Sequence, residues 1–123
     1  MSRISLVAVL VFTLVVAVLV SAGAASAAPV KLVGTVGPGD TIDLRLGAKK
    51  VTRLKAGVAY RIVVTDRSED HDFRLLGPGL NRLVTGEEFI GRQAVLVRFR
   101  KGTYRFFCAP HADEMRGSFR VTR

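Results

Sequence analysis

The side chains in this sequence that bind soft metal ions are few, and most of them lie close together. The chain has one cysteine, Cys108, two histidines, His71 and His111, and one methionine besides the initiator, Met115. Cys108, His111 and Met115 fall within the stretch RFFCAPHADEMRGSFRV at residues 105–121. Two imidazoles, one thiolate and one thioether are the donors of a trigonal copper site that has a weak axial sulfur ligand. If the fold brings His71 to the other three, these residues predict a mononuclear copper site.

Each of these donors suits a copper ion that changes oxidation state. The thiolate of Cys108 makes a short covalent bond to copper, and the imidazoles suit both Cu(II) and Cu(I). The thioether of Met115 binds a hard ion poorly, so it helps to keep Cu(I) accessible. Pro110 fixes one backbone dihedral between Cys108 and His111 and stiffens their loop. The expected cofactor is one copper ion per chain.

Roles other than copper binding account for less of this pattern. A lone cysteine is usually a small buried hydrophobe and a lone methionine is usually core filler, but neither role explains why the rare donors fall together. Zinc would favour further cysteine, histidine or carboxylate ligands over methionine. The C-x-x-C-H motif of c-type haem is absent. A nucleophilic pair of Cys108 and His111 lacks a clear orienting residue and an oxyanion-hole motif, so we expect no enzymatic activity.

The elements that must position these donors are short strands. Runs of alternating apolar and polar residues are separated by turns such as GPGD, KAG, GPG and KG. Such runs, spaced by roughly 8–12 residues, predict an all-β Greek-key antiparallel sandwich or barrel of about 7–8 strands. The segments most compatible with a short helix are NRLVTGEEF and ADEM, at residues 81–89 and 112–115. In a Greek-key sandwich the ends of non-adjacent strands meet at one pole, which would allow His71 to join the other donors.

The first 27 residues differ from the rest of the chain. A basic start, MSR, precedes the uncharged run ISLVAVLVFTLVVAVLV and the small residues SAGAASAA. This is the order of a secretory signal peptide, with cleavage after Ala27 or Ala24. The uncharged residues 4–30 are also numerous enough to span a bilayer, so an uncleaved membrane anchor is the alternative. Either way, residues 28–123 are predicted to form one exported domain in the periplasm, at the cell surface or outside the cell.

The exported part of the chain is basic. Leaving out Arg3, 18 basic residues remain against 10 acidic residues, a net charge of +8. The basic residues are spread along the chain without aromatic clustering, and tryptophan is absent. This pattern argues against nucleic-acid binding and favours a general attraction to anionic surfaces or acidic partners. We expect a monomer with a single domain.

The segment YRFFCAPHADEMRGSFRV resembles the C-terminal ligand loop of cupredoxins of the plastocyanin, pseudoazurin and azurin group. LVGTVGPGDTIDL and VTRLKAGVAYRIVVTDRSEDHDFRLLGPG extend the similarity across most of the chain, which looks like a small secreted bacterial type 1 blue-copper protein. Cys-x-x-His and Met-x-Gly-x-Phe-x-Val are specific in combination with the upstream His-x-Phe. The resemblance implies a Greek-key β-sandwich, equatorial ligands His71, Cys108 and His111, the axial ligand Met115, and one-electron transfer through Cu(II)/Cu(I).

One residue departs from the pattern of these proteins. Asp72 follows His71, where an asparagine that ties the two ligand loops together is common. An ionised carboxylate accepts hydrogen bonds but donates none, and its negative charge favours Cu(II). The departure bears on the reduction potential and leaves the ligand set unchanged.

Electron transfer is the leading function, and copper buffering, delivery or resistance in the cell envelope is the alternative. A metal-free structural or adhesive domain would leave the four donors unexplained, and a copper oxidase would need a multi-copper cluster to reduce oxygen. By resemblance, His111 is the exit for the electron, and a redox partner protein docks near it. Ala109, Pro110, Ala112 and the GPG turn at residues 77–79 are expected to form a small apolar docking surface. A retained N-terminal segment would add membrane association.

Overall fold

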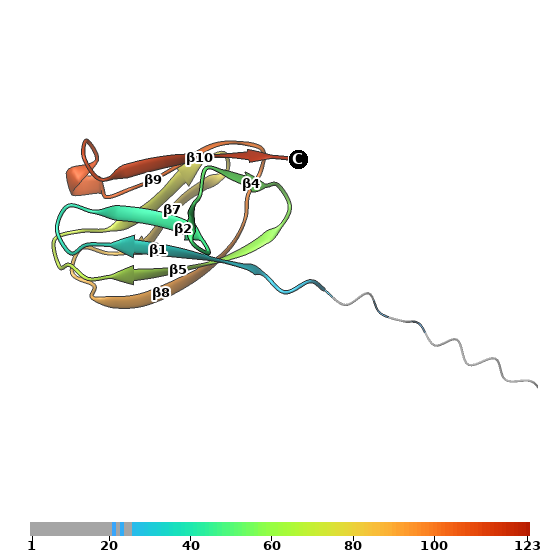
Figure 1. The fold of residues 1–123 in the computed structure, drawn as a ribbon, viewed down its shortest axis with the longest axis horizontal. Coiled ribbons are helices and arrows are strands. Elements are labelled where there is room, and N and C mark those ends of the chain that lie inside the picture. Colours follow the sequence, from blue (N-terminus) through green and yellow to red (C-terminus); the bar gives the residue numbers. More distant parts are fainter. Residues whose placement is uncertain (1–20, 22, 24–25) are drawn as a thin grey trace, which may run out of the picture.

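The protein is described by a computed structural model that covers Ser21, Gly23 and residues 26–123 (Figure 1). The predicted signal peptide falls almost wholly outside the described residues, and its cleavage stays a prediction. Within the described part of the chain, no helix is long and apolar enough to cross a membrane.

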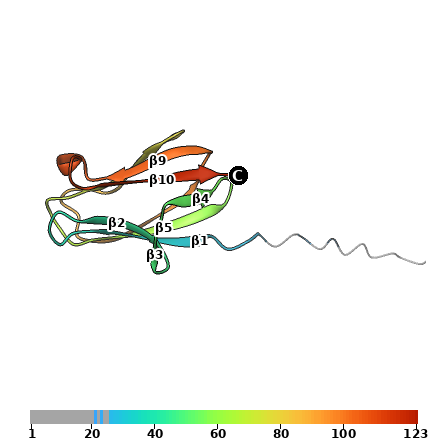
Figure 2. The same ribbon diagram turned by 45° about the horizontal axis from the view of Figure 1, so that its top comes forward.

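Two five-stranded sheets pack face to face (Figures 1 and 2). The first sheet has the spatial order β3 (Lys49–Lys50), β2 (Ile42–Leu46), β1 (Val30–Val36), β5 (Ala59–Asp66) and β8 (Gly91–Arg98). The second has the order β4 (Arg53–Lys55), β10 (Arg116–Thr122), β9 (Gly102–Phe107), β6 (Phe73–Gly77) and β7 (Leu80–Thr85). One 3₁₀ turn, η1 (Ala109–His111), follows β9. The predicted all-β sandwich is confirmed, and its strands number ten because β3 and β4 are very short additions.

Two details differ from the expectation of antiparallel strands and short helices. β1 pairs with β5, and β4 pairs with β10, in parallel, because the chain crosses to the other sheet and returns between these strands. The segment NRLVTGEEF belongs mainly to β7, whose pairing with β6 across the sheet outweighs a weak local helical pattern. ADEM forms turns after η1.

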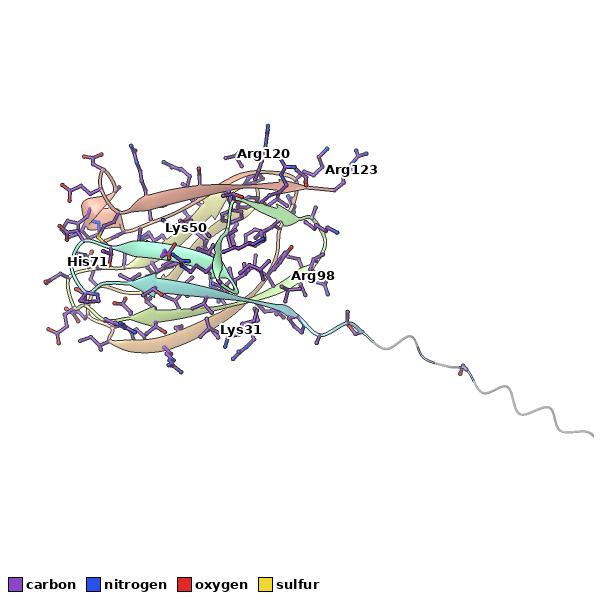
Figure 3. The ribbon with its side chains drawn as sticks, viewed as in Figure 1. Lys31, Lys50, His71, Arg98, Arg120 and Arg123 are labelled. Carbon is purple, nitrogen blue, oxygen red and sulfur yellow. The ribbon has the colours of Figure 1, made fainter. Side chains whose placement is uncertain are left out.

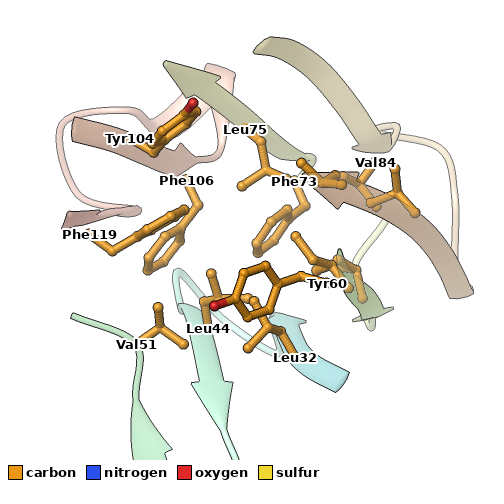
Figure 4. Close-up of a cluster of buried hydrophobic side chains, with 14 of the residues drawn as sticks. Leu32, Leu44, Val51, Tyr60, Phe73, Leu75, Val84, Tyr104, Phe106 and Phe119 are labelled. Carbon is orange, nitrogen blue, oxygen red and sulfur yellow. The ribbon is translucent and has the colours of Figure 1, made fainter. Parts of the chain in front are cut away.

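The core follows from the alternation of side chains along each strand. In β5, Tyr60, Ile62 and Val64 point between the sheets, whereas Arg61 is exposed. In β8, Val97 is buried and Leu96 is exposed. Aromatic and aliphatic side chains of both sheets fill the space between them (Figure 4). The buried hydrophobic residues run from Leu32 to Val121, so the domain contains its own complete core.

Four loops meet at one end of the sandwich, which we call the loop pole: residues 37–41, 67–72, 86–90 and 108–115. Strand pairs such as β1 with β2, β5 with β8, and β9 with β10 all end or begin there. At the opposite end, the terminal pole, lie the start of β1, the end of β10 and the turns 78–79 and 99–101 (Figure 1).

The GPG turn at residues 77–79 belongs to the terminal pole, so its predicted place in a docking surface beside His111 is wrong. The turn is held there by Tyr104, whose hydroxyl donates to the Pro78 carbonyl at 2.8 Å and accepts from the Arg100 amide at 3.1 Å. Turn residues in the sequence reveal a reversal of the chain but not the pole at which it occurs.

Candidate metal centre

Adjacent strands of one sheet bring His71 and Cys108 together. His71 lies just before β6 and Cys108 just after β9. These strands run antiparallel with Arg74 opposite Phe107, so the start of one lies beside the end of the other. The turn η1 then folds His111 back, with its amide donating to the Cys108 carbonyl at 3.2 Å. The three predicted donors are thus within 4.8 Å of one another.

The three donor atoms form a nearly regular triangle. His71 Nδ1 is 3.1 Å from His111 Nδ1, and each nitrogen is 3.7 Å from Cys108 Sγ. A point equidistant from all three lies about 2.0 Å from each, close to the bond lengths of about 2.0–2.3 Å that imidazole and thiolate make to a zinc-sized ion. The residues therefore fit a metal ion bound by two imidazoles and one thiolate.

The ring of His71 is fixed in the orientation that such an ion requires. Its Nε2 lies 2.9 Å from the carbonyl oxygen of Gly39, in the GPGD turn between β1 and β2, and the side chain is almost completely buried. A neutral imidazole that donates from Nε2 to this carbonyl presents the lone pair of Nδ1 to the other donors. In the sequence, Gly39 is recognisable only as part of a turn.

Cys108 is fully buried beneath the two histidines. Burial raises the pKa of the Cys108 thiol, whereas hydrogen bonds from the backbone act in the opposite direction. The amide of Asp72 lies 3.4 Å from Sγ and donates to it. A metal ion bound by Cys108 as a thiolate would therefore displace a proton from this sulfur.

Met115 occupies the same loop, and its side chain is fully buried. Its carbonyl accepts from the Cys108 amide at 3.0 Å, and its amide donates to the His111 carbonyl at 2.8 Å. The backbone thus ties Met115 to both neighbouring donors. Its role as axial ligand stays a prediction of the sequence.

Gly117 explains one part of the Met-x-Gly-x-Phe pattern. A Cβ at this position would lie 2.1 Å from the ring of Phe106 on the adjacent strand. The absence of a side chain lets the Phe106 ring cover β10 directly after the ligand loop.

Asp72 ties the two ligand loops together by accepting a hydrogen bond. Its Oδ1 accepts from the Ala109 amide at 2.6 Å, and its Oδ2 is 2.9 Å from Nε of Arg74. The carboxyl group is almost completely buried, whereas the Arg74 side chain is about one-third exposed. Sequence reasoning missed Arg74, although residues two apart in a strand share a face. This ion pair offsets the negative charge that Asp72 brings to the site.

The centre opens to the surface through an acidic depression. Its wall contains His111, which is partly exposed, and the acidic residues Asp40, Glu69, Asp70 and Glu87. Ala109 and Pro110 are exposed beside it, so the predicted apolar surface reduces to a small patch with acidic surroundings.

Comparison with known proteins bears on the fold. No protein-family model matches the sequence, and no curated protein sequence is significantly similar to it. Among solved structures, reduced rusticyanin matches with a TM-score of 0.58 and 19% identity over 80% of this chain and 82% of its own. Rusticyanin from Thiobacillus ferrooxidans matches with a TM-score of 0.57 and 20% identity over 79% of each chain. A chain of a heme-copper terminal oxidase dimer matches with a TM-score of 0.52 and 17% identity, over 75% of this chain and 63% of its own. The sandwich therefore has the cupredoxin fold.

Proposed function

We propose that this chain is a type 1 blue-copper protein that carries single electrons, with one copper ion held by His71, Cys108, His111 and Met115. The observation that carries the proposal is the triangle of Nδ1, Nδ1 and Sγ atoms, whose size fits one ion. The similarity in fold to rusticyanin, described as a copper protein and solved in a reduced form, supports the choice of metal and of chemistry.

The surroundings of the donors favour fast electron transfer because they hold the donors in place. When bound, copper supplies a one-electron couple between Cu(II) and Cu(I). Gly39 fixes the ring of His71, Asp72 joins the two ligand loops, and a backbone hydrogen bond connects Cys108 with Met115. Ligands held in this way need little rearrangement when the charge of the ion changes.

His111 is the route that we propose for the electron, because it is the only partly exposed member of the triad, whereas His71 and Cys108 are buried. The acidic residues around it favour a redox partner whose docking surface is positively charged. This charge pattern surrounds what is left of the small apolar docking surface that the sequence suggested, which has lost the GPG turn.

The test uses the copper-loaded domain, mixed rapidly with cationic and anionic one-electron reagents of similar potential. We expect reduction and reoxidation within milliseconds to seconds, faster with the cationic reagent at low ionic strength, and no loss of copper to a competing chelator. The variant with Glu69→Gln and Asp70→Asn should lose part of the preference for the cationic reagent. The matched variant with Lys49→Gln and Lys50→Gln, which removes exposed charges from the β2–β3 hairpin, should retain it.

Copper buffering or delivery is the second candidate, and the acidic depression favours it, because negative charge at the mouth would attract copper ions. It predicts the reverse outcome: rapid loss of copper to a chelator and slow electron exchange with both reagents.

Export of the domain, which both functions assume, remains a prediction and is tested by the N-terminal sequence of the protein recovered from outside the cytoplasm.

A further inference from the structure

The acidic residues of the domain are confined to one of its two poles, whereas basic residues lie at both. Nine of the ten acidic residues of the sequence lie in or directly beside the four loops of the loop pole, and the tenth, Asp43, is the second residue of β2, which begins at this pole. At the terminal pole, the described residues include exposed basic side chains and no acidic ones (Figure 3). The basic residues that we use below are Lys31, Arg53, Lys55, Arg98, Arg120 and Arg123. A distribution of this kind gives the domain a strongly positive face opposite the candidate metal centre.

This positive face has an apolar centre. A depression opens between β1, β4 and β5, and its lining is almost entirely apolar. Its walls include Val30, Leu46, Leu54 and Val58, with Arg53 and Lys55 beside them. Val30 and Leu46 remain 36% and 45% exposed. Apolar side chains surrounded by basic ones are the combination that binds the interface of an anionic bilayer, where phosphates meet acyl chains.

The path of the chain points to a membrane as the occupant of this face. β1 begins at the terminal pole with Val30, and Ser26, Ala27 and Ala28 lie beside Val58 and Arg98 at the same pole. The uncharged residues 4–29 of the sequence precede Val30. If that segment stays in a bilayer, the terminal pole lies next to the lipid surface.

We infer that the terminal pole is a docking face for anionic phospholipid bilayers. Its basic residues contact lipid phosphates, and Val30, Leu46 and their neighbours contact the acyl boundary. This arrangement turns the loop pole, with His111 and the acidic depression, away from the membrane. The inference does not depend on copper, since none of these residues belongs to the candidate metal centre.

The first experiment measures binding of residues 28–123, which contain the complete core, to vesicles with and without phosphatidylglycerol. We expect binding only to the anionic vesicles, and its loss when the ionic strength rises from about 0.05 M to about 0.5 M. Replacing Arg53, Lys55 and Arg123 with glutamine should weaken it about fivefold per charge, or about a hundredfold in all. The matched variant replaces Arg67, Arg92 and Arg116, which are exposed at the loop pole, and has the same net charge; it should bind like the parent domain.

The second experiment reports which pole touches the lipid. The chain has no tryptophan, so Leu46→Trp and Ile90→Trp each introduce a single emitter at an exposed apolar position, one at each pole. Brominated anionic lipid should quench the tryptophan at position 46 and leave the one at position 90 unaffected.

Three results would overturn the inference: equal loss of binding in the two triple variants, quenching at position 90 alone or equally at both positions, or binding to a soluble anionic polymer without binding to vesicles. Vesicle binding that persists in Cys108→Ser would show that this face works independently of the metal. A domain that fails to bind copper but docks in this way would contradict the proposed function and leave the inference intact.

Discussion

The loop pole and the terminal pole belong to the same sandwich, yet different interactions hold them together. At the loop pole, side chains accept or donate hydrogen bonds across loops: His71 to Gly39, and Asp72 to Ala109. The terminal pole has side-chain hydrogen bonds too, such as those of Tyr104, but it adds a cluster of aromatic rings. The ring of Phe99 contacts the rings of Tyr104 and Phe119 there, at centroid distances of 4.8 and 5.2 Å.

Burial of polar groups shows the same contrast. The four buried polar or charged residues of the described chain are Asp66, His71, Asp72 and Thr85, and all of them lie at or beside the loop pole. Burying such groups is costly unless they are paired, and a domain that serves only as a scaffold has no need of them. The concentration at one pole therefore points to this pole as the candidate functional one.

The largest effect is expected from Cys108→Ser. A serine hydroxyl has nearly the shape of the thiol but cannot supply the thiolate bond, so the intense colour of the Cu(II) protein should disappear. Circular dichroism should show an unchanged sheet signal. Retention of the blue colour would show that another sulfur binds the ion.

The two histidines should differ when each is replaced by glycine and imidazole is added. His111 is partly exposed, whereas His71 is 3% exposed. Free imidazole should therefore enter the cavity left by His111→Gly more easily than the cavity left by His71→Gly. We expect both variants to lose the native spectrum and only His111→Gly to recover it. Equal recovery would mean that the loop pole opens more widely than the structure shows.

Met115→Leu should keep copper and colour, because the three equatorial donors remain. Leucine and methionine have similar volumes, so the buried position should tolerate the change. A hydrophobic side chain in place of even this weak donor leaves Cu(II) with less donation than before, and so favours Cu(I) further. The reduction potential should therefore rise, on the order of 60 mV for a tenfold change in relative affinity. Loss of copper in this variant, together with a native spectrum in His111→Ala, would reverse the roles assigned within the loop and favour a Cu(I)-handling site.

Asp72→Asn and Arg74→Gln should shift the potential in opposite directions. Asp72→Asn removes a negative charge that stabilises Cu(II), so it should raise the potential. Arg74→Gln removes the cation that offsets this negative charge, so it should lower the potential. Shifts of tens of millivolts are expected, since about 1.4 kcal/mol corresponds to about 59 mV for one electron. Lys55→Gln, at the terminal pole, is the control and should leave the potential unchanged. Shifts of the same sign in both variants would mean that this ion pair does not act through its charge.

Tyr104→Phe should have the smallest effect on the metal centre. It removes the hydrogen bonds to Pro78 and Arg100 and should lower the free energy of unfolding by about 1–3 kcal/mol. The spectrum of the copper protein should not change. A changed spectrum would show that the two poles are coupled through the sheet.

The sequence was sufficient to predict the class of fold and the grouping of His71, Cys108 and His111, because rare residue types and the resemblance to cupredoxins pointed to the same positions. It could not show that β6 and β9 are neighbours, which is what places His71 over Cys108. Predicting the ion pair of Asp72 with Arg74 would have required knowing where β6 begins. Predicting the position of the GPG turn would have required knowing the direction of each strand. These features depend on pairing between distant segments, whereas local patterns report only neighbours along the chain.

The central claim is tested most directly by adding one equivalent of Cu(II) to the purified domain and recording its visible and electron paramagnetic resonance spectra. A trigonal site with a thiolate ligand predicts one copper per chain, an intense blue charge-transfer band, and the resonance spectrum of a type 1 centre. A colourless protein with the spectrum of ordinary tetragonal Cu(II) would contradict the assignment of His71, Cys108 and His111 to a blue-copper centre.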